Sequence, residues 1–204
     1  VIITGVSSLL IILFSSMCAY SFVRKDWKIN KFLFLLMLFS MVVPFQVVMI
    51  PLISIYGGTF GILNHRATLI FMHVGFSMSM SVFMFHGFIR GGVPIALEEA
   101  AGIDGAGPLR IFFQIVFPLL KPTIATLVIL HALALWNDYL LPSLILTDKA
   151  LYTIPIATKL FQGAYSNDMD LLMAALVMAI IPAIILYLAL QKYIIAGVVA
   201  GAVK

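Results

Sequence analysis

Five long apolar stretches follow one another along the chain, separated by shorter segments that contain charged residues, glycine and proline. An α-helix needs about 20 apolar residues to cross the hydrocarbon core of a bilayer. Each stretch has roughly that length, so the pattern predicts an all-α integral membrane protein whose single domain covers residues 1–204. The five stretches lie at about 1–23, 32–56, 67–90, 121–144 and 171–194.

The composition agrees with a membrane domain, because 63% of the residues are hydrophobic and only 10% are charged. A chain of this length cannot hide so much apolar surface in a water-soluble core. The single cysteine, Cys18, lies inside the first apolar stretch, so this chain can build neither a disulfide framework nor a cysteine metal site. The first stretch begins at Val1 with no methionine or basic segment before it, so we expect no signal peptide here and expect an upstream segment to be missing.

The basic residues indicate orientation in the membrane rather than a nucleic-acid partner. The net charge is +4, but the basic residues are scattered and form no patch with interleaved aromatic residues. Cytoplasmic loops of membrane proteins carry an excess of lysine and arginine. With the carboxyl end of the first stretch in the cytoplasm, nine of the twelve basic residues are cytoplasmic: Arg24, Lys25, Lys28, Lys31, Arg90, Arg110, Lys121, Lys192 and Lys204. Arg66, Lys149 and Lys159 then lie outside, in a turn over 57–66 and a connection over about 145–170.

The segment 98–107 is the only long charged break, and this orientation places it in the cytoplasm. Pro94 suits the first turn of a helix, where the N–H that proline lacks would have no partner. We expect residues 95–102 to form about two helical turns, with Glu98 and Glu99 pointing away from Ile95 and Leu97. The break is thus predicted to contain a short helix that lies across the membrane surface between two spans.

Two interpretations of this short helix are open. It can dock in the groove of a soluble partner, because Ala100 and Ala101 beside a carboxylate permit close approach. It can also be an amphipathic linker that rests on lipid headgroups, as many surface helices do. Two acidic residues that face an anionic leaflet argue against the second interpretation.

The break also carries a spaced motif: Glu99-Ala100-Ala101, then Gly105, Ile115 and Phe117-Pro118. This motif resembles the EAA loop of the permease subunits of binding-protein-dependent ABC importers. The wider text, residues 97–106 and 115–122, is similar to the carbohydrate-uptake branch, above all to the second permease of maltose-type and multiple-sugar-type importers. Phe117 stands where the family usually has leucine, and Gly102 where many relatives have arginine, so one charged contact is absent.

Other short motifs extend the resemblance over nearly all of the chain. Family members usually have six spans, so the resemblance implies that five of them are visible and that the first span is missing. The motifs are Pro44-Phe45-Gln46, Ile50-Pro51-Leu52, Trp136-Asn137-Asp138-Tyr139, Pro142, Leu151-Tyr152-Thr153-Ile154-Pro155, Phe161-Gln162-Gly163 and Ala200-Gly201-Ala202-Val203-Lys204.

The resemblance implies a helical-bundle permease with a cytoplasmic coupling helix in the loop of about 94–120. This helix would dock in a cleft of an ATP-hydrolysing subunit, where Glu99 would pair with a basic side chain. The chain has no G-x-x-x-x-G-K-S/T phosphate loop, so ATP and Mg are expected in the partner and no cofactor in this chain. The expected coupling residues are Glu98, Glu99, Ala100, Ala101, Asp104, Gly105, Ile115 and Pro118.

The implied function is the passage of sugar from an extracytoplasmic binding protein across the inner or plasma membrane of a prokaryote. The implied partners are that binding protein, a second homologous permease and two ATP-hydrolysing subunits. An importer for another solute, such as a polyol or glycerol phosphate, is an alternative, because the EAA loop does not recognise the solute. Alternatives from other classes are a membrane scaffold and an intramembrane protease, although a metalloprotease would need convergent ligands such as H-E-x-x-H, a motif that the sequence lacks.

Polar residues in the fourth apolar stretch have two interpretations. His131 and Asp138 are seven residues apart, or two helical turns, so they should share a face that Trp136 and Asn137 flank. They can line a sugar pathway, because sugars favour aromatic stacking together with planar polar groups. They can instead form hydrogen bonds between helices, which are worth about 0.6–2 kcal/mol each.

In the third stretch, His73, Ser77 and Ser81 recur every four residues, a spacing typical of tight helix packing. Prolines interrupt the second and fifth stretches and should kink them. These prolines are Pro44, Pro51 and Pro182.

The outer connection resembles a loop that, in maltose-type relatives, reaches toward the docked sugar-binding protein. An ordinary solvated loop is the alternative interpretation. The candidate contact residues are Gln162, Gly163, Tyr165 and Asn167.

Overall fold

The computed structural model describes residues 1–161 and 169–202, and within these ranges the chain forms helices and no strand. The predicted all-α fold is therefore confirmed. The elements are α1 (Ile2–Arg24), α2 (Lys28–Ser40), α3 (Phe45–Ile53), η1 (Ser54–Thr59), α4 (Arg66–Gly92), α5 (Ile95–Ile103), α6 (Pro108–Ile111), η2 (Phe112–Val116), α7 (Phe117–Leu119), α8 (Lys121–Trp136), α9 (Leu140–Ile145), η3 (Lys149–Leu151), α10 (Ile154–Leu160) and α11 (Met169–Ala202).

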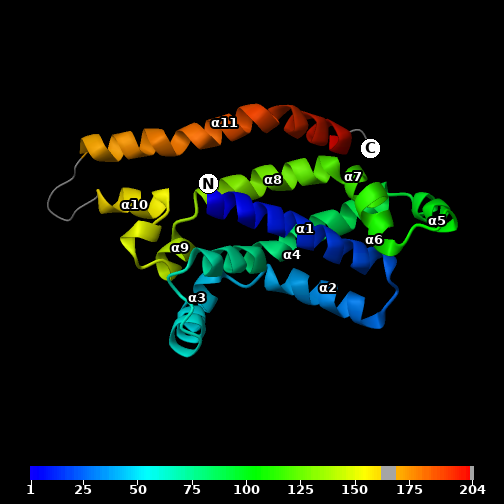
Figure 1. Ribbon diagram of the computed structural model, residues 1–204, viewed down its shortest axis with the longest axis horizontal. Coiled ribbons are helices and arrows are strands. Elements are labelled where there is room, and N and C mark those ends of the chain that lie inside the picture. Colours follow the sequence, from blue (N-terminus) through cyan, green and yellow to red (C-terminus); the bar gives the residue numbers. More distant parts are fainter. Residues whose placement is uncertain (162–168, 203–204) are drawn as a thin grey trace.

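Helices α1, α4 and α8 form the centre of the bundle (Figure 1). One buried apolar cluster joins Ile12 of α1, Phe85 of α4 and Leu127 of α8. Small side chains dominate the buried face of α1, and they let α1 approach α4 closely, as is usual for helices packed within a membrane. These small buried residues are Ser7, Ser8, Ser15, Ser16 and Ala19.

Three described helical segments are long and apolar enough to cross a membrane unaided: α1, α4 and the part of α11 over Met169–Ala189. Two bent pairs of helices reach the same length together. Lys28–Ser40 meets Phe45–Thr59 at 97°, and Pro108–Leu119 meets Lys121–Trp136 at 75°. The described chain therefore has three candidate spans, or up to five if each bent pair counts as one.

The second apolar stretch is not one kinked helix, so the expectation of a single helix over 32–56 was wrong. Helix α2 ends at Ser40, and α3 starts after Pro44, whose ψ of 134° is extended. A proline also disfavours the helical conformation of the residue before it, which explains the break on its amino side. The hydroxyls of Ser40 and Ser79 share a hydrogen bond of 2.8 Å, which attaches the end of α2 to α4. Pro51, in contrast, lies inside α3.

The fourth apolar stretch also ends earlier than expected, because α8 stops at Trp136 rather than near residue 144. The backbone N–H and the side-chain Nδ2 of Asn137 both donate to the carbonyl of Leu133, at 3.2 and 2.8 Å. A short polar side chain that bonds to its own helix competes with the regular ladder and favours its end. Residues 140–145 form the separate helix α9.

Segments that the charge pattern places on the same side of the membrane gather at the same end of the bundle. The α1–α2 turn, α5 and α6 lie at one end, and α3, α9 and α10 at the other (Figure 1). At the second end, Asn64 has a φ of 64° and its Oδ1 accepts the N–H groups of Thr147 and Asp148, at 3.0 and 2.9 Å. Arg66 donates to the carbonyl of Ala150 at 3.2 Å. These bonds join the two connections that were predicted to lie outside.

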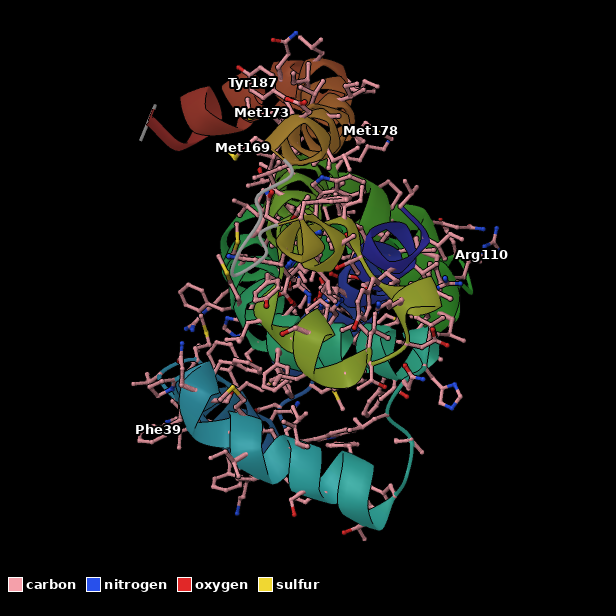
Figure 2. All side chains as sticks on the ribbon, turned by 90° about the vertical axis from the view of Figure 1, so that its left-hand side faces the viewer. Phe39, Arg110, Met169, Met173, Met178 and Tyr187 are labelled. Atoms are coloured by element: carbon pink, nitrogen blue, oxygen red, sulfur yellow. The ribbon has the colours of Figure 1, made fainter. Side chains whose placement is uncertain are left out.

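Helices α11 and α3 lie on opposite sides of the central helices (Figure 2). Helix α11 packs mainly against α8 and, to a smaller extent, α10. Of its side chains that the structure describes, Leu172 is buried, whereas Met173, Met178 and Tyr187 are more than half exposed. An apolar helix exposed to this extent must face lipid or another protein chain.

Candidate functional site

Helix α5 lies at one end of the bundle and connects α4 to the returning segment of α6, η2 and α7 (Figure 1). The predicted short helix is therefore present, and it ends in a Schellman motif. The N–H of Gly105 donates to the carbonyl of Gly102 at 3.1 Å, and the N–H of Ala106 to that of Ala101 at 2.9 Å. Gly105 has a φ of +79°, a left-handed conformation in which a side chain would be strained, so glycine suits this position.

Glu98 points into the protein whereas Glu99 is exposed, so the expectation that the two glutamates lie together on the face opposite Ile95 and Leu97 was wrong. Its side chain is buried at the carboxyl end of α1. The Nε of Arg24 donates to Oε1 at 2.7 Å, and the hydroxyl of Tyr20 donates to Oε2 at 2.8 Å. Periodicity treats a carboxylate as exposed, but a buried carboxylate is tolerated when a cation and hydrogen bonds satisfy it.

The other residues of α5 are almost all exposed. Glu99 and Ala100 are exposed, Ala101 is partly buried, and among the described residues Glu99 has no hydrogen-bond or ion-pair partner. Apolar side chains share this exposed surface, because Ile95 is 54% exposed and Ile103 is 88% exposed. An exposed apolar surface beside a free carboxylate, on a helix that protrudes from the bundle, is suited to binding another protein.

The returning segment anchors the far side of this protrusion. Phe112 and Val116 of η2 are buried in the same cluster as α1 and α4. The predicted coupling residues Ile115 and Pro118 lie on this returning segment, in η2 and α7, and not on α5. Ile115 is half-buried and Pro118 is exposed. Asp104 is exposed at the cap position that ends α5.

The polar residues of the fourth stretch separate into two sites on α4. His131 Nε2 lies 2.6 Å from the hydroxyl of Ser81, and both residues are buried. Asp138 lies beyond the end of α8 and its Oδ2 is 3.1 Å from His73 Nε2, while His73 Nδ1 lies 3.5 Å from the Ser7 hydroxyl. The expectation that His131 and Asp138 share a face of one continuous helix was therefore wrong, although both contact α4.

The sequence identified His73 as a packing residue and missed its pairing with Asp138. Nothing local signals this contact, because the two residues are 65 positions apart. A cavity of about 290 Å³ lies beside the pair, and Arg66, Trp136 and Tyr152 contribute to its lining. Aromatic rings and hydrogen-bonding side chains around a cavity suit a small polar solute.

The other two predicted pathway residues bond within the bundle. The indole N–H of Trp136 donates to the carbonyl of Ala179 at 2.9 Å and so links α8 to α11. Asn137 is exposed and bonds to its own helix. Of the four predicted residues, Trp136 alone lines the cavity, with Asp138 adjoining it through His73.

The predicted contact residues of the outer connection, Gln162, Gly163, Tyr165 and Asn167, lie outside the described residues. The same is true of Lys204 at the chain end. Within residues 1–161 and 169–202, no three histidine, cysteine, aspartate or glutamate side chains gather in a way that could hold a metal ion.

Comparison with known proteins gives a family match over most of the chain. The profile of a family described as "Binding-protein-dependent transport system inner membrane component" matches residues 11–199. The Melibiose/raffinose/stachyose import permease protein MelC of Bacillus subtilis is 45% identical over 203 residues, which are 100% of this chain and 73% of the relative. The Probable starch degradation products transport system permease protein AmyC of Thermoanaerobacterium thermosulfurigenes is 41% identical with the same coverage. The Multiple sugar-binding transport system permease protein MsmG of Streptococcus mutans is 39% identical over 100% of this chain and 74% of its own length.

Proposed function

The chain belongs to the family of binding-protein-dependent transport system inner membrane components, and from this membership we propose that it is the permease subunit through which an ATP-driven importer passes sugar. The resemblance drawn from the EAA-type motif is confirmed at the level of the family. The names of the relatives refer to melibiose, raffinose, stachyose, starch products and multiple sugars, which supports a sugar as the solute.

The observation that supports the mechanism most directly is that nearly all side chains of α5 are exposed. A helix held to the bundle by one buried side chain, with isoleucines and a carboxylate exposed, is the expected form of an element that completes its packing in another subunit. We assign that subunit as the separate ATPase of the importer, which would bind ATP and Mg. ATP-driven movement of the ATPase would then displace α5 and change the opening of the permease.

Six of the eight predicted coupling residues take a role that follows from their place on or beside α5. Glu99 would pair with a cation of the ATPase, and Ala100 and Ala101 would let the helix approach the partner backbone. Asp104 and Gly105 end the helix, which fixes how far it protrudes. Glu98 faces the bundle, so its contribution is internal.

The exposed surface of α11 supports the presence of further partners. Its apolar side chains are exposed on one face of the molecule, because the rest of this chain covers few of them. Such a face would be covered either by lipid or by a second, homologous permease. We propose a complex of two permeases and two ATPase subunits in the inner or plasma membrane of a prokaryote. The extracytoplasmic sugar-binding protein would dock at the end that carries α9 and α10, with Gln162, Gly163, Tyr165 and Asn167 as candidate contacts.

The solute would pass the cavity beside His73, whose lining by Trp136, Tyr152 and Arg66 suits a hydroxylated molecule. His131 is buried, does not line this cavity and bonds to Ser81, so we assign it to helix packing. A polyol or glycerol phosphate remains the second candidate solute, and the exposed cation Arg66 at the cavity is the feature that would favour a phosphate.

The test is reconstitution of the full-length protein in liposomes with its ATPase, its partner permease and its binding protein. Uptake of labelled melibiose, raffinose, maltose, a polyol and glycerol phosphate is measured with and without ATP. We expect ATP-dependent uptake of at least one sugar, and stimulation of ATP hydrolysis by the same sugar. Uptake of glycerol phosphate or a polyol alone would refute the sugar assignment.

A further inference from the structure

Three segments that are distant in the sequence meet at the buried face of α5. Tyr20 and Arg24 come from the last turns of α1, the carbonyl of Val93 from the end of α4, and Glu98 from α5. Arg24 uses two different nitrogens, because Nε donates to Glu98 at 2.7 Å while Nη2 donates to the Val93 carbonyl at 2.7 Å. We call these four residues the anchor cluster.

The charged groups of the anchor cluster are hydrogen-bonded and shielded from solvent. Both carboxylate oxygens of Glu98 are used, one by Arg24 and one by Tyr20. The side chains of Arg24 and Glu98 are only 13% and 9% exposed, so solvent and salt screen their attraction weakly. The Tyr20 ring packs against Phe112 of η2, with centroids 5.2 Å apart, which ties the returning segment to the same point.

Glu98 is also the one buried side chain of α5. No other side chain of α5 is buried, so Glu98 is the deepest contact through which α5 can pass a displacement to the bundle. This contact lies at the carboxyl end of α1, and from there α1 runs back along α4 to Ile3 and Thr4 at the cavity beside His73. A rigid connection at the anchor cluster would carry movement of α5 to that cavity.

We propose that the anchor cluster is the mechanical link of this permease: it makes α5 and α1 move as one body when the ATPase displaces α5. Glu98, Arg24 and Tyr20 are positioning residues that touch neither the ATPase nor the solute. This inference rests on the proposed docking of the ATPase on α5. It differs from that proposal because it concerns transmission after docking.

The geometry separates the roles of charge and shape. Lysine at position 24 would keep the charge, but its single ammonium group cannot reproduce a planar fork that holds Glu98 and the Val93 carbonyl together. Phenylalanine at position 20 would keep the ring against Phe112 and lose only the hydroxyl that donates to Glu98. Glutamine at position 98 would keep the size of the side chain and lose its charge.

The experiment measures sugar molecules transported per ATP hydrolysed in the reconstituted full-length complex. We expect Glu98→Gln and Arg24→Lys each to lower this ratio by about tenfold, within the usual range for coupling between sites, and Tyr20→Phe to lower it less. Binding of the ATPase should stay unchanged, because none of these side chains lies on the exposed face of α5. Lys25→Gln is the matched control, since Lys25 is the exposed neighbour of Arg24, and it should behave as the parent protein.

A distance measurement distinguishes a mechanical role of the anchor cluster from a role in folding alone, because loss of stability by itself would not make the distance between α1 and α5 depend on nucleotide. Spin labels at exposed positions Asp26, two residues after the end of α1, and Ala96 of α5, in a Cys18→Ala background, report the separation of α5 from that end of α1. In the parent complex we expect one narrow distance that ATP trapping leaves unchanged, and in Glu98→Gln a broader distribution that shifts on trapping. If Glu98→Gln does not fold, Arg24→Lys and Tyr20→Phe give the same comparison.

Two results would overturn the link: a distance that changes with nucleotide in the parent complex, or variants of the anchor cluster that transport as much sugar per ATP as the parent. Failure of the proposed function is recognised separately. In that case substitutions on the exposed face of α5 leave ATPase binding intact, whatever the anchor-cluster variants do.

Discussion

Replacement of Ile103 by serine should weaken docking of the ATPase without destabilising the permease. The side chain of Ile103 is 88% exposed, so it contributes almost nothing to the folding of this chain. Full burial of an isoleucine in a partner is worth about 1.5–3 kcal/mol. Nearly all of that free energy is available at position 103, and its loss corresponds to about a ten- to hundredfold rise in the dissociation constant.

The assay is titration of the purified ATPase onto the full-length permease in detergent, followed by ATP hydrolysis in liposomes. The matched control is Ile29→Ser, because Ile29 is also an isoleucine, is 57% exposed and lies in α2, which starts at the same end of the bundle. The thermal unfolding temperatures of both variants should equal that of the parent protein. If Ile103→Ser binds the ATPase as tightly as Ile29→Ser does, α5 is not the docking element and the reasoning fails.

Substitutions at three further positions test the fold. Gly105→Ala should lower the free energy of unfolding by about 1 kcal/mol, because a side chain resists the φ of +79° at this position. The added Cβ would lie within 4 Å of no neighbouring atom, so the cost is in backbone conformation and not in a clash. Hydrogen exchange of the α5 amides should become faster, and an unchanged exchange rate would contradict the prediction. Asn64→Gly keeps a φ of 64° accessible but removes the acceptor of two N–H groups, and it should lower the free energy of unfolding by about 1 kcal/mol, with Asn64→Ala more destabilising; a glycine variant that unfolds at the same temperature as the parent would show that the side-chain bonds do not matter, and an alanine variant no less stable than the glycine variant would show that the backbone conformation does not. His131→Ala removes the bond to Ser81 and should lower stability in detergent by about 0.6–2 kcal/mol; reduced transport at unchanged stability would instead assign His131 to the pathway.

Local features of the sequence predicted a large part of this architecture. The apolar stretches became α1, α4 and α11 because length and hydropathy alone decide which segments can cross a bilayer. The place where α5 ends was also predictable, because Gly105 permits a conformation that side chains resist. The EAA-type motif identified the family, since its spacing lies within one short segment.

Two breaks within apolar stretches were less visible in the sequence. Pro44 signals a disturbance, but the 97° bend also depends on where α2 is attached, through Ser40 and Ser79. The end of α8 at Trp136 depends on the competing hydrogen bonds of Asn137, whereas hydropathy continues past it. Apolar length predicts that a segment is buried in the membrane, but it does not predict that one helix occupies it.

The sequence by itself thus determined that this is a membrane protein with a short helix between two spans, because those properties depend on composition, periodicity and neighbouring residues, and the EAA-type motif carried the resemblance to a permease family. Only the tertiary structure decided which of two adjacent carboxylates faces the bundle, and that His73 meets Asp138. The physical reason is that a buried polar or charged group is stable only beside a partner, and the partners of Glu98 and His73 are 74 and 65 positions away. No local sequence pattern identifies partners so far apart in the chain. The packing of α1, α4, α5 and the segment after α8 brings them together.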